Sequence, residues 1–363
     1  MKLIKVHLKD RGYNIVVGSN IIGSFGNFLN SLNCGNYAVI VTNPSIKRLW
    51  GKKVSGLLKK SGIDVKFEEV ADTEKSKSIE AAFCLLNKIA GEGKSKRLFI
   101  IAFGGGVIGD LAGFVASIYK RGVPYVQLPT TLLAQVDSAI GGKTAIDLKV
   151  GKNLAGVVYQ PRMVFSETSF LESLPSRQIV NGLAEVIKYA IIKDSQLFKF
   201  LDKNPDKILA LEKNSIGHVI ATASRIKAWV VEQDEFDKLG IRVILNFGHT
   251  IGHAIETASG YSKKYFHGEA ISIGMAAATF ISSQLGIISR PAFEKILRLL
   301  ENSGLPVIAE GVNPGKVYEA HLYDKKFSGG KNRFVLPVSI GRVKIVEGVP
   351  DKLVKKAIGL VCG

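Results

Sequence analysis

Short apolar runs rich in β-branched residues alternate with helical patterns through the first half of the chain. Four of these runs cover residues 37–43, 63–70, 97–103 and 123–129. Such alternation is typical of βα units that cover a mostly parallel sheet. Two earlier runs, 2–8 and 13–18, are joined by the short polar segment 9–12 and predict an N-terminal hairpin.

The second half of the chain contains longer segments with helical periodicity. They cover residues 175–193, 215–234, 249–259 and 269–286. Two short apolar runs on either side of Ile340 and Gly341 predict a terminal hairpin. We therefore expect an α/β domain followed by a mainly helical domain, with the boundary near residue 165.

Composition and cysteine usage narrow the class of protein. Of the 363 residues, 46% are hydrophobic and 22% charged, which is enough apolar surface for a packed core and excludes a largely disordered chain. The three cysteines show neither disulfide-framework nor metal-site spacing, and the N-terminus does not have the pattern of a signal peptide, so we expect a cytoplasmic protein. The longest apolar stretch, 270–288, is diluted by polar residues and predicts a buried helix instead of a membrane span.

The chain is strongly basic, with 49 Lys+Arg against 31 Asp+Glu and a formal net charge of +18. Such a charge attracts nucleic acid, membrane surfaces or small anions alike. Basic pairs are scattered and form no block of the length of a binding tail. We therefore expect an anionic small molecule as partner, and neither nucleic acid nor membrane.

A glycine-rich turn follows the apolar run 97–103. In the segment GGGVIGD, Gly104, Gly106 and Gly109 have GxGxxG spacing at the start of a helical pattern. Glycines there let backbone N–H groups approach a pyrophosphate at a helix N-terminus. The acidic ribose partner expected about 20 residues further on in a dinucleotide site is absent from the sequence, so a purely structural turn stays open as an alternative.

Titratable side chains gather in the helical half. Glu185 and Lys188 lie three residues apart in a segment that is otherwise apolar nearly all round, which favours a site over a surface ion pair. His249 and His253 have the i,i+4 spacing of metal ligands, and His267 follows shortly after. A glutamate plus two histidines would leave open positions on Zn²⁺, as catalytic sites do. Spacing favours the pair His249 and His253 but does not decide between His253 and His267.

Polar residues are also concentrated in the glycine-containing segment 129–153. They are Thr130, Thr131, Asp137, Lys143, Lys152 and Asn153. Lysines in glycine-rich turns are often only solvated loop residues. If these line a site, they suit carboxylate and phosphate groups, because each ammonium is a compact charge with three donors.

Together these segments resemble the 3-dehydroquinate synthase family. The resemblance is carried by residues 104–117, 119–147, 151–156, 182–190, 245–256, 266–270 and 324–341. It implies a Rossmann-like NAD-binding domain over 1–165, a mainly helical metal- and substrate-binding domain over 166–363, an active site in the cleft between them, and a homodimer. It also implies a lyase that converts 3-deoxy-D-arabino-heptulosonate 7-phosphate, a phosphorylated sugar acid, to 3-dehydroquinate and phosphate in the shikimate pathway.

The resemblance further implies roles for individual residues. Zn²⁺, or Co²⁺ as a possible substitute, would be bound by Glu185, His249 and His267. NAD would be bound within 72–77 and 106–110 and by further residues, the set being Asp72, Glu74, Lys77, Gly105, Gly106, Val107, Asp110, Thr130, Thr131, Asp137, Lys143, Lys152, Phe170 and Ser173. Catalytic and substrate contacts would come from Asp137, Lys143, Asn153, Lys188, Lys227, Arg242, Asn246, His253 and Lys325, with Arg121 reaching the phosphate from the neighbouring subunit.

A few positions depart from the family pattern. Asn43 stands where the family commonly has an Asp for the adenosine ribose, Thr73 replaces a usual Gly, and Ser173 a usual Thr. Three alternatives remain beside this reading. They are another sugar-phosphate cyclase, a metal-dependent polyol dehydrogenase of related fold, and a basic nucleic-acid-binding protein.

Overall fold

The described residues form two compact units in the computed structural model. The structure describes residues 1–92, 97–260, 264–323 and 331–363. Unit 1 comprises Met1–Leu174 and Ile216–Phe236, and unit 2 comprises Pro175–Ser215 and Asp237–Gly363. The segment Ile216–Phe236 thus belongs to unit 1 although it follows the first helices of unit 2. The division into domains 1–165 and 166–363 stays a prediction.

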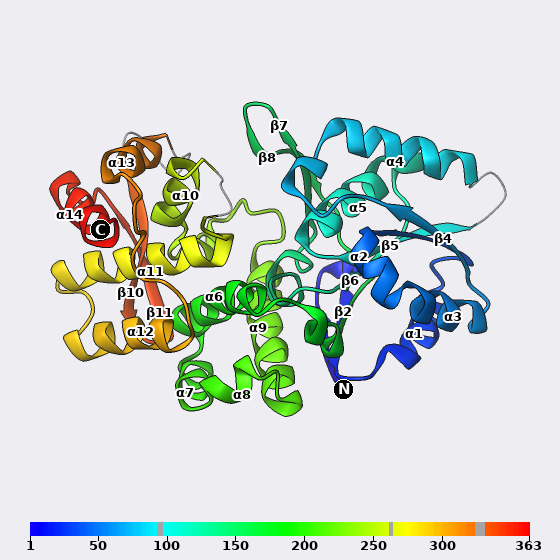
Figure 1. Ribbon diagram of the computed structural model, residues 1–363, viewed down its shortest axis with the longest axis horizontal. Coiled ribbons are helices and arrows are strands. Elements are labelled where there is room, and N and C mark those ends of the chain that lie inside the picture. The colour runs from blue at the N-terminus through cyan, green and yellow to red at the C-terminus, as the bar shows by residue number, and fades with distance from the viewer. Residues whose placement is uncertain (93–96, 261–263, 324–330) are drawn as a thin grey trace. The chain divides into compact units, whose positions relative to one another are not determined.

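A mostly parallel sheet forms the centre of unit 1 (Figure 1). Its seven strands, within the described ranges, follow the order β1 (Lys2–Val6), β2 (Tyr13–Gly18), β9 (Met163–Glu167), β6 (Tyr125–Pro129), β5 (Leu98–Gly104), β3 (Tyr37–Thr42) and β4 (Asp64–Glu69). Only β1 and β2 pair antiparallel, which confirms the predicted N-terminal hairpin, and the other neighbours pair parallel. The expected α/β fold class is therefore confirmed.

Helices cover both faces of this sheet. The helices α1 (Phe25–Leu32) and α3 (Lys52–Lys60) pack on one face, and α4 (Ile79–Glu92) and α5 (Gly106–Ile118) pack on the other (Figure 1). On the interior strand β3, Ala38 and Ile40 face the first pair of helices, whereas Val39 and Val41 face the second. A strand covered on both faces is apolar at every position, which is the reason for the continuous apolar runs in the sequence.

The lysine-bearing segment after β6 is a hairpin and not a set of loops. Strands β7 (Lys143–Leu148) and β8 (Gly151–Val158) pair antiparallel, with an irregularity between Ile146 and Leu148. The predicted placement of Lys143 and Lys152 in glycine-rich turns is wrong, because Lys143 begins β7 and Lys152 lies in β8. The β-branched residues of these two strands are spread among charged residues, Asn and Gly, so the hairpin lacks the continuous apolar runs that identified the sheet strands.

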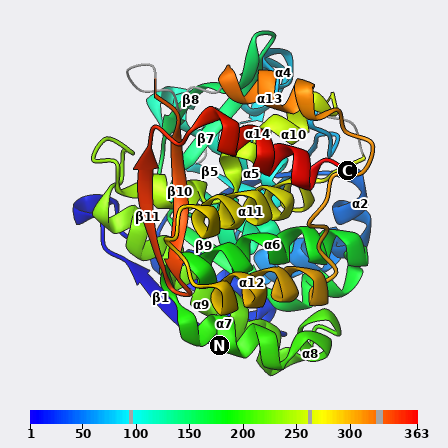
Figure 2. The same cartoon turned by 90° about the vertical axis from the view of Figure 1, so that its left-hand side faces the viewer.

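Unit 2 is mainly helical. Its helices and its strand pair are α6 (Ser176–Lys193), α7 (Ser195–Lys203), α8 (Pro205–Leu209), α10 (His249–Ala258), α11 (His267–Gln284), α12 (Arg290–Asn302), α13 (Pro314–Leu322), α14 (Asp351–Val361), β10 (Arg333–Ser339) and β11 (Arg342–Glu347). Helix α11 lies among α6, α10, α12 and α14 (Figure 2). The antiparallel pairing of β10 with β11 confirms the predicted terminal hairpin. The short α2 (Pro44–Ile46) lies in unit 1, and most of the long α9 (Lys213–Gln233) also belongs to unit 1.

Two glycines of α11 allow its close approach to neighbouring helices. A Cβ on Gly274 would lie 1.9 Å from the carbonyl oxygen of Gly248, and a Cβ on Gly268 would lie 1.9 Å from that of Asn181. No side chain fits at such distances, so these positions bring α11 against the start of α10 and against α6. The predicted buried helix is confirmed, and no helix in the described ranges is both long enough and apolar enough to cross a bilayer.

Candidate functional site

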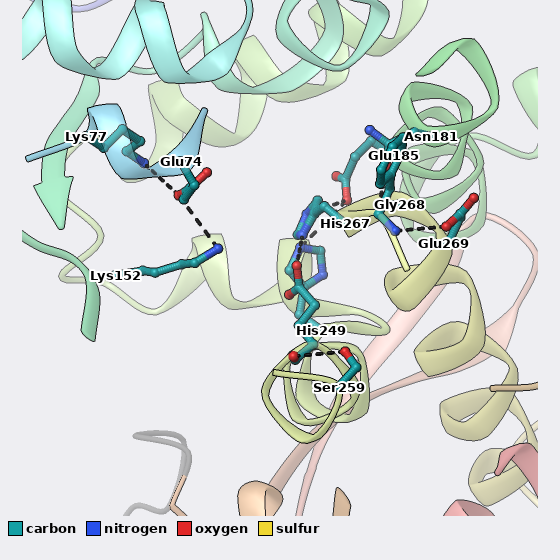
Figure 3. Close-up of polar contacts among 12 residues, drawn as sticks. Glu74, Lys77, Lys152, Asn181, Glu185, His249, Ser259, His267, Gly268 and Glu269 are labelled. Atoms are coloured by element: carbon teal, nitrogen blue, oxygen red, sulfur yellow. Dashed lines mark hydrogen bonds and ion pairs between the residues drawn. The ribbon is translucent and has the colours of Figure 1, made fainter. Parts of the chain in front are cut away.

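Three helices of unit 2 bring a carboxylate and two imidazoles together (Figure 3). Glu185 lies in α6, while His249 and His267 are the first residues of α10 and α11. The Oε1 atom of Glu185 lies 3.6 Å from Nε2 of His249 and 3.8 Å from Nε2 of His267. Ligands about 2.0–2.2 Å from a tetrahedral Zn²⁺ lie about 3.4 Å apart, so one divalent cation suits this spacing.

The carboxylate of Glu185 is buried without hydrogen bonds. Its side chain is 1% exposed, and among the described residues neither oxygen accepts a hydrogen bond. The ammonium of Lys188, itself 2% exposed, makes an ion pair with Oε2 at poor hydrogen-bonding geometry. Burying a carboxylate is costly unless positive charge and hydrogen bonds compensate it. A cation beside Oε1 would supply the missing compensation.

The hydrogen bonds of the two histidines fix which ring nitrogen faces Glu185. Nδ1 of His249 lies 3.1 Å from the carbonyl oxygen of Phe247, and Nδ1 of His267 lies 3.3 Å from Oε1 of Glu256. Both partners accept, so we infer that each Nδ1 carries the proton and each neutral ring presents an Nε2 lone pair toward Glu185. The carboxylate of Glu185 and the two Nε2 atoms thus direct electron pairs toward one point, as the ligands of a metal cation do. Phe247 and Glu256 would orient the two imidazole ligands.

The environment of His267 also shifts its titration. Burial lowers the pKa of His267, but the hydrogen bond to Glu256 and the negative charges of Glu256 and Glu185 outweigh burial, so that its pKa lies above the ordinary value. In the absence of a metal, these carboxylates favour the protonated ring.

His253 does not complete the cluster around Glu185. Among the described residues, the sets that could hold a metal are Glu185, His249 and His267, and separately His253, Glu256 and His267. The pairing of His249 with His253, which spacing favoured, is not the arrangement that the structure brings to Glu185. The i,i+4 spacing places both rings on one side of α10, with centroids 5.2 Å apart. The position of α6 decides which of them meets the carboxylate.

A second polar cluster lies in unit 1, around the ammonium of Lys77 (Figure 3). Lys77 is 4% exposed and donates to Oδ2 of Asp110 at 2.8 Å and to Oδ1 of Asn153. Oε1 of Glu74 lies 3.7 Å from the ammonium groups of both Lys77 and Lys152. Residues far apart in the sequence therefore meet where η4 (Glu74–Ser76), α5 and β8 come together.

Asp110 titrates abnormally in this cluster. Burial raises the pKa of Asp110 to about 6, and the negative charges of Glu74 and Asp137 act in the same direction. The ammonium of Lys77 opposes the rise but does not cancel it. This carboxyl therefore changes its protonation state at about pH 6.

The glycine-rich turn leads directly from β5 into α5. A Cβ on Gly105 would lie 3.2 Å from Cγ2 of Thr131, and one on Gly106 would lie 3.1 Å from Oγ of Ser138. The segment that follows β6 thus packs against the first turn of α5. The N–H groups of a first turn have no acceptor within their own helix and suit a phosphate. Val107 is half-buried in the same turn, and Thr130 is buried beside it.

The remaining expected cofactor residues have diverse surroundings. Asn43 donates from Nδ2 to Asp72 at 2.9 Å and caps α2 by accepting from the N–H of Ile46. Phe170 is 1% exposed and packs in the core against Trp50, whose indole N–H is 3.4 Å from Oγ of Ser173. The side chain of Phe170 is therefore part of the hydrophobic core of unit 1.

The expected substrate residues divide between the two units. In unit 1, Lys227 of α9 forms a 2.6 Å ion pair with Asp137 of the π-helical turn η6 (Ala134–Ser138), and Lys143 is exposed at the start of β7. In unit 2, Arg242 is buried and Asn246 half-buried in η8 (Ile241–Asn246).

Two further expectations concern residues at the surface and beyond the described ranges. Arg121 is exposed in a left-handed conformation with φ of 66°. Lys325 lies outside the described residues.

Comparisons with known proteins cover nearly the whole chain. Family models described as 3-dehydroquinate synthase N-terminal and C-terminal match residues 68–181 and 182–327. A 3-dehydroquinate synthase of Desulforamulus reducens is 44% identical over 352 residues, which are 97% of this chain and 98% of that protein.

Two solved structures have the same fold. A 2-epi-5-epi-valiolone synthase from Streptomyces hygroscopicus subsp. jinggangensis, with NAD⁺ and Zn²⁺ bound, is 25% identical with a TM-score of 0.88 over 98% of each chain. A 2-deoxy-scyllo-inosose synthase in complex with carbaglucose-6-phosphate, NAD⁺ and Co²⁺ is 24% identical with a TM-score of 0.88, covering 98% of this chain and 99% of that one.

Proposed function

The chain belongs to the 3-dehydroquinate synthase family, and on this premise we propose that it converts 3-deoxy-D-arabino-heptulosonate 7-phosphate to 3-dehydroquinate and phosphate. The single observation that carries the proposal beyond family membership is the meeting of Glu185, His249 and His267 at one point. We also propose that NAD⁺ and a divalent cation, Zn²⁺ or Co²⁺, are required.

The residues present fit both groups. Two hydrogen-bonded imidazoles and a buried carboxylate whose Oε1 accepts no hydrogen bond among the described residues suit Zn²⁺. The turn at Gly105 and Gly106 and the Lys77 cluster suit a dinucleotide. When bound, the cation polarises substrate hydroxyl groups as a Lewis acid, and the nicotinamide takes up a hydride and later returns it. The overall reaction is then an elimination and ring closure with no net oxidation, which makes the enzyme a lyase.

The chain's own residues would orient the reactants and stabilise charge. Lys188 engages Oε2 of Glu185 and leaves Oε1 toward the imidazoles. Glu256 and the Phe247 carbonyl hold the two imidazole protons on Nδ1. These contacts keep the donor set in one orientation, so that little reorganisation is needed when the ligand binds.

Cationic side chains would hold the substrate's anionic groups. We assign the carboxylate of the sugar acid to Lys227, Arg242 and Asn246, and its phosphate to Lys143 and Asn153. Lysine and arginine donate to such oxyanions with charge-assisted hydrogen bonds. Fixing the phosphate favours its departure, because the negative charge that develops on the leaving group is already balanced. We propose that His253, which is exposed on α10, contacts substrate or moves a proton.

One assay separates this proposal from its alternatives. Purified protein is mixed with NAD⁺, Zn²⁺ and the heptulosonate phosphate, and both inorganic phosphate and 3-dehydroquinate are followed. We expect equal amounts of the two products with no accumulation of NADH. Turnover of a different sugar phosphate instead would indicate another sugar-phosphate cyclase. Accumulating NADH without phosphate release would indicate a polyol dehydrogenase.

We also propose a cytoplasmic homodimer in which Arg121 acts on the neighbouring subunit's substrate. The support is the family resemblance together with the exposure and left-handed backbone of Arg121. Mixing inactive Arg121→Ala and Glu185→Gln proteins tests this. If Arg121 acts across subunits, subunit exchange restores a site that has both residues, and activity reappears. Light scattering that reports only monomers, or no recovery after exchange, would contradict the proposal.

A further inference from the structure

A polar stripe on α6 extends beyond the candidate metal site. Arg177, Asn181, Glu185 and Lys188 follow one another at intervals of four, four and three residues, so they lie on one face of the helix. Glu185 faces the two imidazoles. The two earlier residues contact the first turn of α11, where His267 is the first residue.

Asn181 binds the backbone next to His267. Its Oδ1 accepts from the N–H of Gly268 at 2.6 Å, and Asn181 is 5% exposed (Figure 3). A first-turn N–H has no acceptor within its own helix. Here the acceptor comes from α6, the helix that also carries Glu185.

Arg177 holds the same turn from its other side. Its Nε and Nη2 donate to the two carboxylate oxygens of Glu269 at 2.7 and 2.8 Å, and Nη2 also donates to the carbonyl oxygen of Lys264 at 2.6 Å. Its guanidinium carbon lies 4.1 Å above the ring of Phe266. Glu269 in turn accepts from the N–H of Phe266 at 2.8 Å. Residues on both sides of His267 are therefore tied to α6.

His267 needs such anchoring more than the other two candidate ligands do. Its side chain is 34% exposed, against 11% for His249 and 1% for Glu185. Packing therefore holds Glu185 and His249 in place, but it leaves one side of the His267 ring in solvent. The position of His267 depends on where the first turn of α11 is held.

We propose that Asn181 and Arg177 are positioning residues that hold His267 at the distance from Glu185 that a divalent cation requires. The inference rests on the proposed metal site. Neither residue belongs to the two sets of side chains that could hold a metal among the described residues. Each acts by fixing the start of α11 against the helix that carries Glu185, so one rigid element sets the separation of two ligands.

Substitutions at Asn181 test the hydrogen bond to Gly268. Zn²⁺ affinity of the full chain is measured by competition with a chromophoric chelator. Asn181→Leu keeps the size but removes the acceptor, and we expect a 10- to 100-fold weaker affinity, as for other residues that orient metal ligands. Asn181→Asp keeps the acceptor and should retain an affinity within about threefold of the parent. A residue needed only for folding would change the metal-free melting temperature and leave the Zn²⁺ affinity unchanged.

Arg177 has a closely matched control within the chain. Arg11 makes the same two-fold contact with Glu235, at 3.0 and 2.9 Å, and those side chains are 43% and 11% exposed. The side chains of Arg177 and Glu269 are 47% and 11% exposed. We expect Arg177→Gln to weaken Zn²⁺ binding about 10-fold and Arg11→Gln to leave it unchanged. Arg11→Gln loses a carboxylate contact of similar exposure and, in addition, the ion pair of Arg11 with Asp10 at 3.2 Å.

The outcomes separate the two proposals. If the parent protein does not bind Zn²⁺, the metal site itself is refuted and the positioning role with it. If the parent binds Zn²⁺ and both Asn181→Leu and Arg177→Gln bind it as tightly, the metal site stands and the positioning role is overturned. If Asn181→Leu does not fold, the comparison of Arg177→Gln with Arg11→Gln decides alone.

Discussion

Gly268 offers the sharpest test of how the fold builds the candidate metal site, because this residue has no side chain. The Cβ of Gly268→Ala would lie 1.9 Å from the carbonyl oxygen of Asn181, whereas ordinary contact begins at 3.4 Å. The first turn of α11 must therefore move from α6 by about 1.5 Å. Metal–ligand distances tolerate only about 0.2 Å. The adjacent His267 would move well beyond that tolerance relative to Glu185.

We expect Gly268→Ala to bind Zn²⁺ at least about 100-fold more weakly and to lose about 1–3 kcal/mol of unfolding free energy from overpacking. Chelator competition measures the first quantity, and urea unfolding of the metal-free protein measures the second. The control is Gly359→Ala in α14, where a Cβ meets nothing within 4 Å. It should keep full Zn²⁺ affinity and gain about 0.4–1 kcal/mol. If Gly268→Ala matched the parent in both quantities, close contact between α6 and α11 would not build the site.

Further predictions concern charge and pH. Glu185→Gln should abolish Zn²⁺ binding, as measured by equilibrium dialysis, and lower the rate of phosphate release by orders of magnitude. Removing the metal from the parent with a chelator should lower the rate of phosphate release in the same way. A Glu185→Gln protein that is fully active without bound metal would contradict the metal site. Glu256 raises the pKa of His267, and protons compete with Zn²⁺ for the imidazole below that pKa. The pH at which Zn²⁺ affinity falls should therefore be lower in Glu256→Gln than in the parent. An unchanged dependence of Zn²⁺ affinity on pH would argue against the contact between Glu256 and His267. Asp110 ionises at about pH 6 when folded but near 3.8 when unfolded. Relative to Asp110→Asn, the parent should therefore lose about 2 kcal/mol of unfolding free energy as pH rises from 4 to 6. Urea unfolding of the two proteins measures this loss, and an equal pH dependence of both would show that the pKa of Asp110 is not raised.

Much of the fold could be predicted from hydrophobic pattern alone. The two hairpins, the strands at 37–43 and 97–103, and the segments that form α6 and α11 were all identified in the sequence, because burial on one or two faces leaves a direct periodic signal. Strand β9 was not predicted. Its residues, Met163–Glu167, are completely buried, but the run is only five residues long and includes Ser and Glu.

The candidate site was predicted only in part for a related reason. Glu185 and Lys188 were conspicuous because charge is rare in an apolar helix, and the histidines because they are few. Asn181, Arg177 and Glu256 gave no comparable signal. Polar residues such as asparagine and arginine are common at helical positions in any sequence. Their roles here depend on which groups of a neighbouring helix lie opposite them in the folded protein.

The sequence by itself determined most of the sheet strands and the long helices of the second half, the faces that they bury, and the residue types that are available for binding a cation and anions. Periodicity and composition carry this information because each segment responds to burial largely on its own. Residue spacing did not decide between His253 and His267, although the family resemblance implied His267. The tertiary structure brings His249 and His267, and not the closely spaced His249 and His253, to the carboxylate of Glu185. Distances between helices depend on packing at contacts such as Gly268 against Asn181, and sequence spacing within one helix contains no measure of them.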